Sequence, residues 1–483
     1  MGMNPGGNPV DSSDGRTSCV SSGSLMPIVA AILISALLSG AIWCSGASEH
    51  GPQVRVLVCL GGMVAVTLLV RVLRHEKNIF PWDWRWGGPL LGLLALVAIQ
   101  AVNASHHFLP GSEALVPQNH FHWLPRSVDA ATTFGALLLL VGYAAAFWLA
   151  RVWLNDRRAR LTFVILQVAC GTVMAVLVIS QRSLPPPGAL YLFTGAFINP
   201  NHYAAYANIL LALALFWGLD CSADGWRRGR LGHAGWLLFP AAIILFTSVL
   251  RSGARMGAAV SLLVVSVVVI GFGLRMARNR WRLILTLGAA AGLVLLAAVA
   301  VWDKPLNTIS RAARSLQQLF GNVTPRLDGQ QVQGNVASRW AVNRAVAGMI
   351  VDRWATGVGA GTFGLAFPYY QPHSMSGFYR HAHNEYLQCV AELGILGSIL
   401  LLWAACAMVL ARPKINYLGQ ALSSRERWGI VLALGCLGLH AMTDFPLRLP
   451  ALAFLMMTLV GLSRGQLFND NSWMKPVSHE QTR

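Results

Sequence analysis

Long apolar runs alternate with short polar segments over most of the chain. The runs are about 20 residues long, which is the length that an α-helix needs to cross the hydrocarbon core of a bilayer. Each run is therefore expected to form a membrane-spanning helix. The twelve expected spans are residues 25–44, 54–73, 88–104, 130–150, 161–180, 203–219, 234–250, 256–274, 283–302, 384–411, 428–444 and 450–466.

The composition supports the same class of protein. The 483 residues are 55% hydrophobic and only 12% charged, whereas soluble domains carry roughly 25% charged residues. Lipid offers no hydrogen-bond partner to exposed backbone groups, and no alternating barrel-type strands are evident. The sequence therefore predicts an all-α, polytopic membrane protein of about twelve transmembrane helices with one large periplasmic loop.

The positive charge is distributed by side of the membrane. The formal net charge is +18, and 23 of the 37 Lys and Arg residues fall in segments on one side when the N-terminus is cytoplasmic. Short cytoplasmic loops are enriched in Lys and Arg, so we expect both termini on the cytoplasmic side of a bacterial inner membrane. This asymmetry explains the charge without a nucleic-acid partner.

The predicted topology divides the chain into tails, helices and one long external loop. Within the loop, apolar spacing predicts helices near residues 306–320 and 338–354, followed by irregular structure rich in Gly, Pro and aromatic residues. A loop of this length between membrane helices is usually functional or disordered, and its aromatic residues favour function. The divisions are a tail at 1–24, helices at 25–302, the periplasmic loop at 303–383, helices at 384–466 and a tail at 467–483.

The segment YRHAHNEYLQCVAELGILGS, residues 379–398, places ionisable side chains at the mouth of a membrane helix. Arg380, His381 and His383 precede the helix, and a histidine is a natural general base near neutral pH. Glu385 and Glu392 share one helical face, which should point to a bundle interior or a wet cavity. The alternatives are interfacial histidines that solvate the helix start and carboxylates that bridge helices.

Two further groups are expected at the same outer surface. LRSGARMG, residues 250–257, puts Arg251 and Arg255 in a short turn, and guanidinium groups suit phosphate oxygens. Snorkelling of both side chains is the alternative. NPNH, residues 199–202, places Asn199, Asn201 and His202 at a helix start, where Asn201 alone could serve as a cap.

The segment HAMTDFPLRLP, residues 440–450, forms a fourth group. His440 and Asp444 are one helical turn apart, and Arg448 follows. Either the first two form an internal ion pair or they point toward the other groups.

Other motifs are excluded. GVGAGTF, residues 357–363, lacks GxGxxG spacing and a P-loop lysine, so it is interpreted as turn structure. The outer loops carry no acidic pair that would hold a divalent cation beside a diphosphate, so no metal and no cofactor are expected. The eight cysteines show no CxxC spacing, which disfavours a zinc site or a disulfide framework.

An enzyme on the outer face has no nucleotide pool and must use a substrate that carries its own activation. A polyprenyl-diphosphate-linked glycan meets this requirement, because the diphosphate is the leaving group. Arginines would neutralise its developing charge, and a histidine would accept the proton of an attacking hydroxyl. The expected partners are this donor, a glycan or lipid acceptor, the membrane and other polysaccharide-assembly proteins.

Several motifs resemble the O-antigen ligase and polymerase superfamily. They are NPNHYAAY, RSGA, RW…DRWATGVGAGTF…YYQP, HAHNEYLQCVAELGILG with Asn384 after the histidine, and HAMTDFPLRLPA, in that order over residues 190–465. The resemblance implies a metal-independent glycosyltransferase of C-type architecture that acts in lipopolysaccharide or exopolysaccharide synthesis. It also implies His383 as the base, with Arg251 and Arg339 as arginine ligands.

The resemblance leaves some questions open. Leu250 stands where the family usually has Ser, so either Arg251 or Arg255 could be the main diphosphate ligand. The motifs do not distinguish a ligase from a polymerase or name the acceptor. A transporter or flippase for lipid-linked glycans, and a non-catalytic assembly partner, are the competing hypotheses.

Overall fold

The computed structural model describes residues 25–76, 83–109, 114–180, 196–227, 234–276, 336–373, 375, 377–410 and 422–463. The expected span at 283–302, the expected helix at 306–320 and both tails lie outside these residues. The long helices are α1 (Met26–Trp43), α2 (His50–Leu73), α3 (Trp84–Val102), α4 (Ala130–Trp153), α5 (Arg157–Ser180), α6 (Pro200–Arg227), α7 (Leu238–Ser252), α8 (Arg255–Met276), α11 (Val336–Asp352), α13 (Glu385–Leu410), α14 (Ser424–Ala441) and α15 (Pro450–Leu462). Shorter elements are α12 (Phe363–Ala366) and the 3-10 turns η1 (Ser45–Ala47), η2 (Ala234–Leu237), η4 (Phe367–Tyr369) and η5 (Pro446–Arg448).

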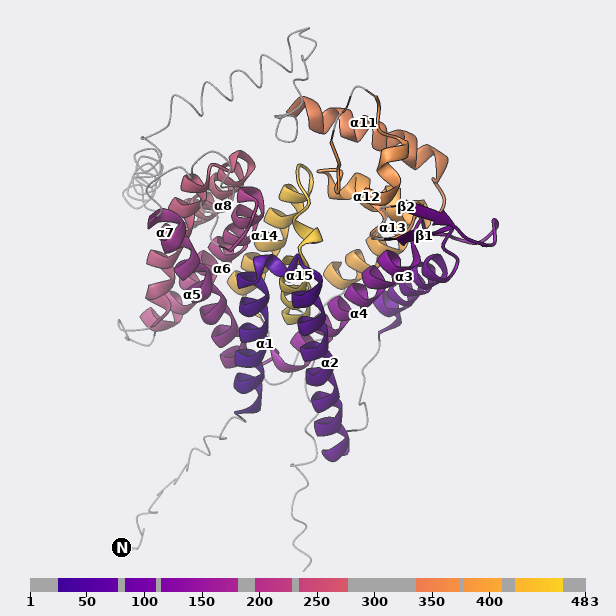
Figure 1. The fold of residues 1–483 in the computed structure, drawn as a ribbon. Helices are drawn as coiled ribbons and strands as arrows, with labels where there is room; N and C mark the ends of the chain where they lie inside the picture. Colours follow the sequence, from indigo (N-terminus) through magenta and orange to yellow (C-terminus); the bar gives the residue numbers. More distant parts are fainter. Residues whose placement is uncertain are drawn as a thin grey trace, which may run out of the picture.

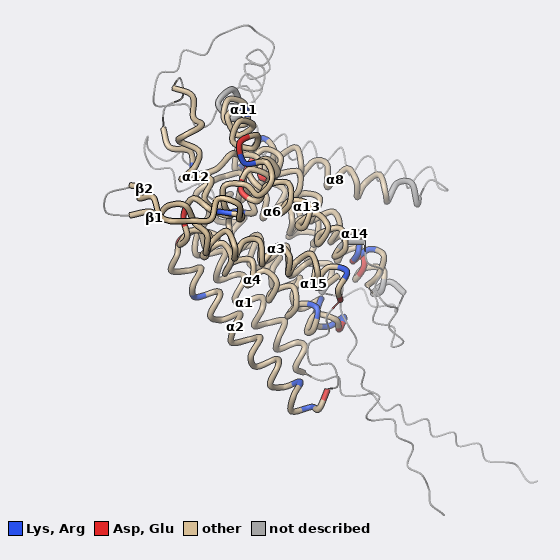
Figure 2. The backbone as a smooth tube through the Cα atoms, turned by 90° about the vertical axis from the view of Figure 1, so that its right-hand side faces the viewer, with Lys and Arg blue, Asp and Glu red and all other residues tan. Residues whose placement is uncertain are grey.

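Within the described residues, eight helices are long and apolar enough to cross a membrane. They are α1 to α6, η2 together with α7, and α13, while the segment Arg255–Gly271 of α8 and the helix α15 are shorter apolar helices. Figure 2 shows charged residues mainly toward the ends of the long helices. These features agree with a polytopic all-α membrane protein, and the count of twelve spans and their sidedness stay predictions.

The helices form two groups that meet at α14, α15 and α1. The helices α5 to α8 lie together on one side, and α14 packs closely on α6 (Figure 1). On the other side, α13 packs on α3, α3 packs on α4, and α15 packs on α4. The short turn between α14 and α15, residues 442–449, therefore lies where the two groups meet.

One end of the bundle is covered by α11, α12 and a hairpin (Figure 1). The expected loop helix at 338–354 is confirmed as α11. The hairpin is a departure from the purely helical expectation. Strands β1 (His106–Leu109) and β2 (Ala114–Pro117) pair antiparallel, with His107 opposite Val116 and Phe108 opposite Leu115. Apolar residues in both short segments could have indicated this pairing.

Helix α13 is not continuous, although the sequence predicts one uninterrupted span. Gly394 has φ 65° and ψ −174°, which interrupts the helix. At this break the Ile395 N–H donates to the Trp354 carbonyl at 2.8 Å, and the Leu396 N–H donates to Ala355 at 3.1 Å. A Cβ at Gly394 would lie 2.4 Å from the Ala355 backbone, so only glycine allows this approach.

Candidate functional site

The start of α6 is organised by Asn199. Its side-chain oxygen accepts a hydrogen bond from the Asn201 N–H at 2.9 Å, and Pro200 occupies the first helical position. Pro is favoured there because its missing N–H would have no helical partner. Asn199 is therefore the cap, and the alternative that Asn201 caps the helix is wrong. The Asn201 side chain is consequently available for a tertiary contact.

Asp444 lies in the turn after α14 and is 2% exposed. The Asn201 side-chain amide donates to Asp444 Oδ2 at 2.6 Å, and the Phe445 N–H donates to Oδ1 at 3.0 Å. His202 Nε2 lies 3.7 Å from Oδ1, and His383 Nδ1 lies 3.3 Å from it. One buried carboxylate thus joins the start of α6 to the residues before α13. We call Asn199, Asn201, His202, His383 and Asp444 the Asp444 cluster.

His383 adopts an unusual backbone conformation. Its φ is 53°, in the left-handed region that few residues other than glycine occupy. Such a conformation costs about 1–3 kcal/mol and persists only where surrounding contacts hold it. The side chain is 19% exposed, and its ring packs edge-on against Phe445 with centroids 4.9 Å apart. The strained backbone directs a partly accessible imidazole at Asp444.

Three imidazoles surround the Phe445 ring. The rings of His202, His381 and His383 lie with centroids 4.7, 4.3 and 4.9 Å from it. Asp444 and Phe445 are adjacent in the chain, so the turn supplies both the acid and the apolar surface that position the histidines.

The electrostatic environment differs between these groups. Burial alone would raise the pKa of Asp444, but the imidazoles of His202 and His383 outweigh it and hold the pKa below its ordinary value. Burial, with added repulsion from Arg448, lowers the pKa of His381 to about 3. At neutral pH, Asp444 is therefore ionised and His381 is neutral.

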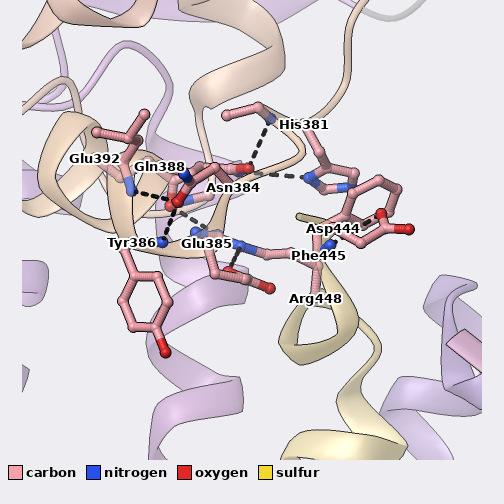
Figure 3. Close-up of polar contacts among 12 residues, drawn as sticks. His381, Asn384, Glu385, Tyr386, Gln388, Glu392, Asp444, Phe445 and Arg448 are labelled. Atoms are coloured by element: carbon pink, nitrogen blue, oxygen red, sulfur yellow. Dashed lines mark hydrogen bonds and ion pairs between the residues drawn. The ribbon is translucent and has the colours of Figure 1, made fainter. Parts of the chain in front are cut away.

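A second network, centred on Arg448, occupies the same turn (Figure 3). Arg448 Nε donates to Glu385 Oε2 at 3.1 Å, and its NH1 group donates to Glu392 Oε2 at 2.8 Å. Gln388 donates to Glu392 Oε1 at 2.9 Å and accepts from the Ala382 N–H at 3.0 Å. We call Glu385, Gln388, Glu392 and Arg448 the Arg448 network.

The burial of the two glutamates is confirmed, with exposures of 7% for Glu385 and 2% for Glu392. Both carboxylates bind Arg448, so they serve as a polar bridge between segments, which is one of the two roles that their positions in the sequence allow. Burial alone would lower the pKa of Arg448, but Glu392 and Glu385 raise it above the ordinary value. The arginine therefore stays charged and joins α13 to the turn.

The glycine-rich segment GVGAGTF attaches to the same network. The Gly361 N–H donates to Glu392 Oε2 at 2.9 Å, and the Gly359 N–H donates to the Glu392 carbonyl at 3.0 Å. Gly357 has φ 72°, and a Cβ there would lie 2.3 Å from the Glu392 backbone. These glycines serve close backbone approach, which agrees with the interpretation of this segment as turn structure.

The arginine-bearing turn between α7 and α8 lies against the start of α6. Gly253 ends α7 in the left-handed conformation with φ 75°. A Cβ on Gly257 would lie 2.4 Å from the Ala204 Cβ, and the Tyr203 hydroxyl donates to Ser248 at 2.6 Å. Arg251 is half-buried and Arg255 is exposed. The turn thus neighbours the residues that follow His202.

The remaining predicted residues are placed as follows. Arg380 is exposed, next to His381. Asn384 caps α13, since its side-chain oxygen accepts from the Tyr386 and Leu387 N–H groups at 3.1 and 3.2 Å. Arg339 lies on α11, and its side chain is outside the described part of the chain.

His440 and Asp444 were expected either to form an ion pair with each other or to point toward the other polar groups, and the structure separates their side-chain partners. His440 is 1% exposed, and its Nε2 lies 3.2 Å from the Asn208 side-chain amide. Asp444 instead contacts His383 and the start of α6, so it points toward the other groups. The sequence predicts no partner for Arg448, which stands out only as an arginine four residues after Asp444. Its two-carboxylate network was missed, although an arginine near two buried glutamates is a recognisable signal.

Comparison with protein families gives one match. Residues 240–402 match the Wzy_C family model, described as O-Antigen ligase. This segment of the chain is similar to the O-antigen ligase family. The matched segment contains Arg251, Arg255 and His383, while Asp444 and Arg448 lie beyond its end. A search of curated proteins finds no match.

The match confirms the resemblance to the O-antigen ligase and polymerase superfamily that the motifs indicate. It indicates a membrane enzyme of the glycan ligase or polymerase type in general. The donor, the acceptor and the roles of individual side chains belong to the proposal that follows.

Proposed function

We propose that this protein transfers a glycan from a polyprenyl-diphosphate donor to an acceptor hydroxyl, without a metal ion. The reaction takes place at the periplasmic face of the inner membrane. The observation that carries the proposal is the contact of His383 Nδ1 with Asp444 Oδ1 at 3.3 Å. When Nδ1 carries the proton and its N–H donates a hydrogen bond to the carboxylate, the free lone pair lies on Nε2. A partly exposed imidazole in this tautomer can act as a general base.

The reaction is a single displacement. His383 takes the proton of the acceptor hydroxyl as its oxygen attacks the anomeric carbon. The bond from that carbon to the diphosphate oxygen breaks, the configuration inverts, and polyprenyl diphosphate leaves. Asp444 stabilises the imidazolium that forms, because a carboxylate near a cation lowers its free energy.

Arginine side chains neutralise the leaving group in this scheme. Arg251 and Arg255 are the first candidates, since their turn packs beside the start of α6 that holds Asn201 and His202. Arg380, directly before His381, and Arg339 on α11 are further candidates. Guanidinium groups bind phosphate oxygens by paired hydrogen bonds and keep their charge at any working pH.

Purified protein with a polyprenyl-diphosphate glycan and candidate acceptors tests the proposal. His383→Ala should lower turnover by about 10²–10⁴-fold, the usual contribution of a general base, while donor binding and thermal stability stay at the wild-type level. Unchanged turnover would remove the base assignment. Activity should persist in EDTA, and its loss would contradict the metal-independent mechanism.

A transporter or flippase for lipid-linked glycans is the alternative. Such a path would need polar groups free to contact a moving headgroup, whereas Glu385 and Glu392 are engaged by Arg448. Headgroup transfer across vesicles without any glycosidic product would favour the alternative.

A further inference from the structure

An open groove of about 500 Å³ lies where α3 ends, and none of the residues of the Asp444 cluster lines it. Its α3 wall is apolar and consists of Ala98, Ile99 and Val102. The opposite wall is the segment after the hairpin, with His120, Phe121 and Leu124. Helix α3 is long and apolar enough to cross a membrane, so its exposed face would meet lipid chains.

Asn103 fixes the shape of this groove. It is 5% exposed, and its amide lies within 2.9 Å of the Phe121 carbonyl and 3.2 Å of the Pro125 carbonyl. Its side-chain oxygen accepts from the Phe121 N–H at 2.7 Å. A buried side chain that satisfies this many backbone groups holds the segment in one conformation.

A cationic group stands at the rim. Arg126 NH1 lies 2.6 Å from His120 Nε2 and 3.3 Å from His122 Nδ1. His120 Nδ1 lies 3.1 Å from the Gln118 carbonyl, so Nδ1 carries the proton and Nε2 accepts from Arg126. The two histidines therefore orient the guanidinium without neutralising it.

A second arginine adds to the positive charge. Burial lowers the pKa of Arg126, and repulsion from Arg353 lowers it further. Among the residues that the structure describes, no carboxylate forms an ion pair with Arg126. A guanidinium group that no carboxylate pairs suits an anion such as a phosphate.

The side chains of the groove and of the segment before Arg126 are exposed and apolar. Val102 is 90% exposed, Trp123 is 79% exposed and Phe121 is 63% exposed. Exposed aromatic residues beside a spanning helix are typical of the membrane–water interface, where phospholipid headgroups lie. A soluble anion would gain nothing from this apolar wall, whereas a lipid would contact both parts.

We propose that this groove binds a phosphate-bearing membrane lipid, with its phosphate on Arg126 and its chains along Ile99 and Val102. This inference does not rest on the proposed transferase function. The segment after the hairpin is joined to the glycine-rich segment GVGAGTF, because the Val128 N–H donates to the Val358 carbonyl at 2.9 Å. A lipid bound in the groove would therefore also stabilise the glycine-rich segment.

Native mass spectrometry of the delipidated protein in detergent tests the proposal, with dioleoylphosphatidylglycerol as the probe. Arg126→Gln should weaken lipid binding by about tenfold, which is what loss of one charge-assisted hydrogen bond gives. Val102→Asn, at a position too exposed to affect folding, should weaken it by about threefold through lost apolar contact. Arg344→Gln, at an exposed arginine of α11, is the matched control and should bind as wild type.

Two further probes separate lipid from other ligands. Dioleoylglycerol supplies the chains without the phosphate, and glycerol 3-phosphate supplies the phosphate without the chains. Both should bind at least tenfold more weakly than the complete lipid. Wild-type affinity of both Arg126→Gln and Val102→Asn overturns the proposal, and so does glycerol 3-phosphate binding as tightly as the lipid.

Discussion

The turn between α14 and α15 carries two polar centres of opposite design. At Asp444, one carboxylate is surrounded by side-chain amides and imidazoles. At Arg448, one cation is held by two carboxylates and stays charged. The first centre keeps a partly exposed imidazole, whereas the second joins α13, the turn and the glycine segment. Chemistry is therefore expected at Asp444 and structural support at Arg448.

Removing the cation from the Arg448 network should have the largest effect. Arg448→Ala leaves the carboxylates of Glu385 and Glu392 buried without a cation, which costs about 3–5 kcal/mol in free energy of unfolding. The variant should express poorly and melt at a lower temperature in detergent. Arg448→Met combined with Glu385→Gln and Glu392→Gln removes all the charges and should recover much of the stability. An unchanged melting temperature for Arg448→Ala would contradict the structural assignment.

Changing the acid of the other centre should act on activity rather than on folding. Asp444→Asn keeps the shape but removes the charge that stabilises the His383 imidazolium, so kcat should fall by about 10–100-fold. Asp220→Asn is a matched control, because Asp220 is also a buried acid with basic partners, Arg157 and Arg425, but lies near the C-terminal end of α6. Equal turnover losses for the two variants would show that Asp444 has only a general structural effect.

The arginine turn offers a smaller effect that separates two candidates. Each of Arg251→Gln and Arg255→Gln removes a possible charge-assisted bond to the donor diphosphate, which is worth about 1.5–3 kcal/mol. The variant that loses the main ligand should raise KM for the donor by about tenfold or more, and the other should change it less. Wild-type kinetics for both would exclude this turn as the diphosphate site.

The pH dependence of stability should show the smallest effect. The folded-state pKa of His381 is lowered to about 3, below its ordinary value, so the unfolded chain binds this proton more readily. Stability should therefore fall as the pH drops below about 6.5 toward 3, by on the order of 1 kcal/mol between pH 7 and pH 5. His381→Gln should flatten a plot of melting temperature against pH. An unchanged slope would show that His381 is not held neutral.

Much of the helical framework could be predicted because lipid imposes a simple rule. A span must be apolar for about 20 residues and helical throughout, so each expected span from 25–44 to 256–274, and each after residue 384, coincides with a helix. The hairpin at His106–Pro117 and the break at Gly394 were missed. Both depend on pairing with backbone from another part of the chain, which local periodicity does not report.

The candidate site was predictable as a set of residues but not as an arrangement. His383, Asn199, Asn201 and Asp444 were selected because polar side chains at the ends of apolar helices stand out in the sequence. The identity of the cap, the strained φ of His383 and the division of the turn into two centres were not predictable. Asp444 is 243 residues from Asn201, and no local pattern encodes that contact.

The sequence by itself determined the class of protein, the positions of the helices and the residue types available for chemistry, because hydrophobic length and family motifs are local properties. Tertiary structure decided which acid meets which base. Packing of α6 against α14, and of α13 against α3, brings His202, His383 and Asp444 together while reserving Arg448 for Glu385 and Glu392. Such pairing follows from burial, since each buried charge must find a partner when the helices close around it.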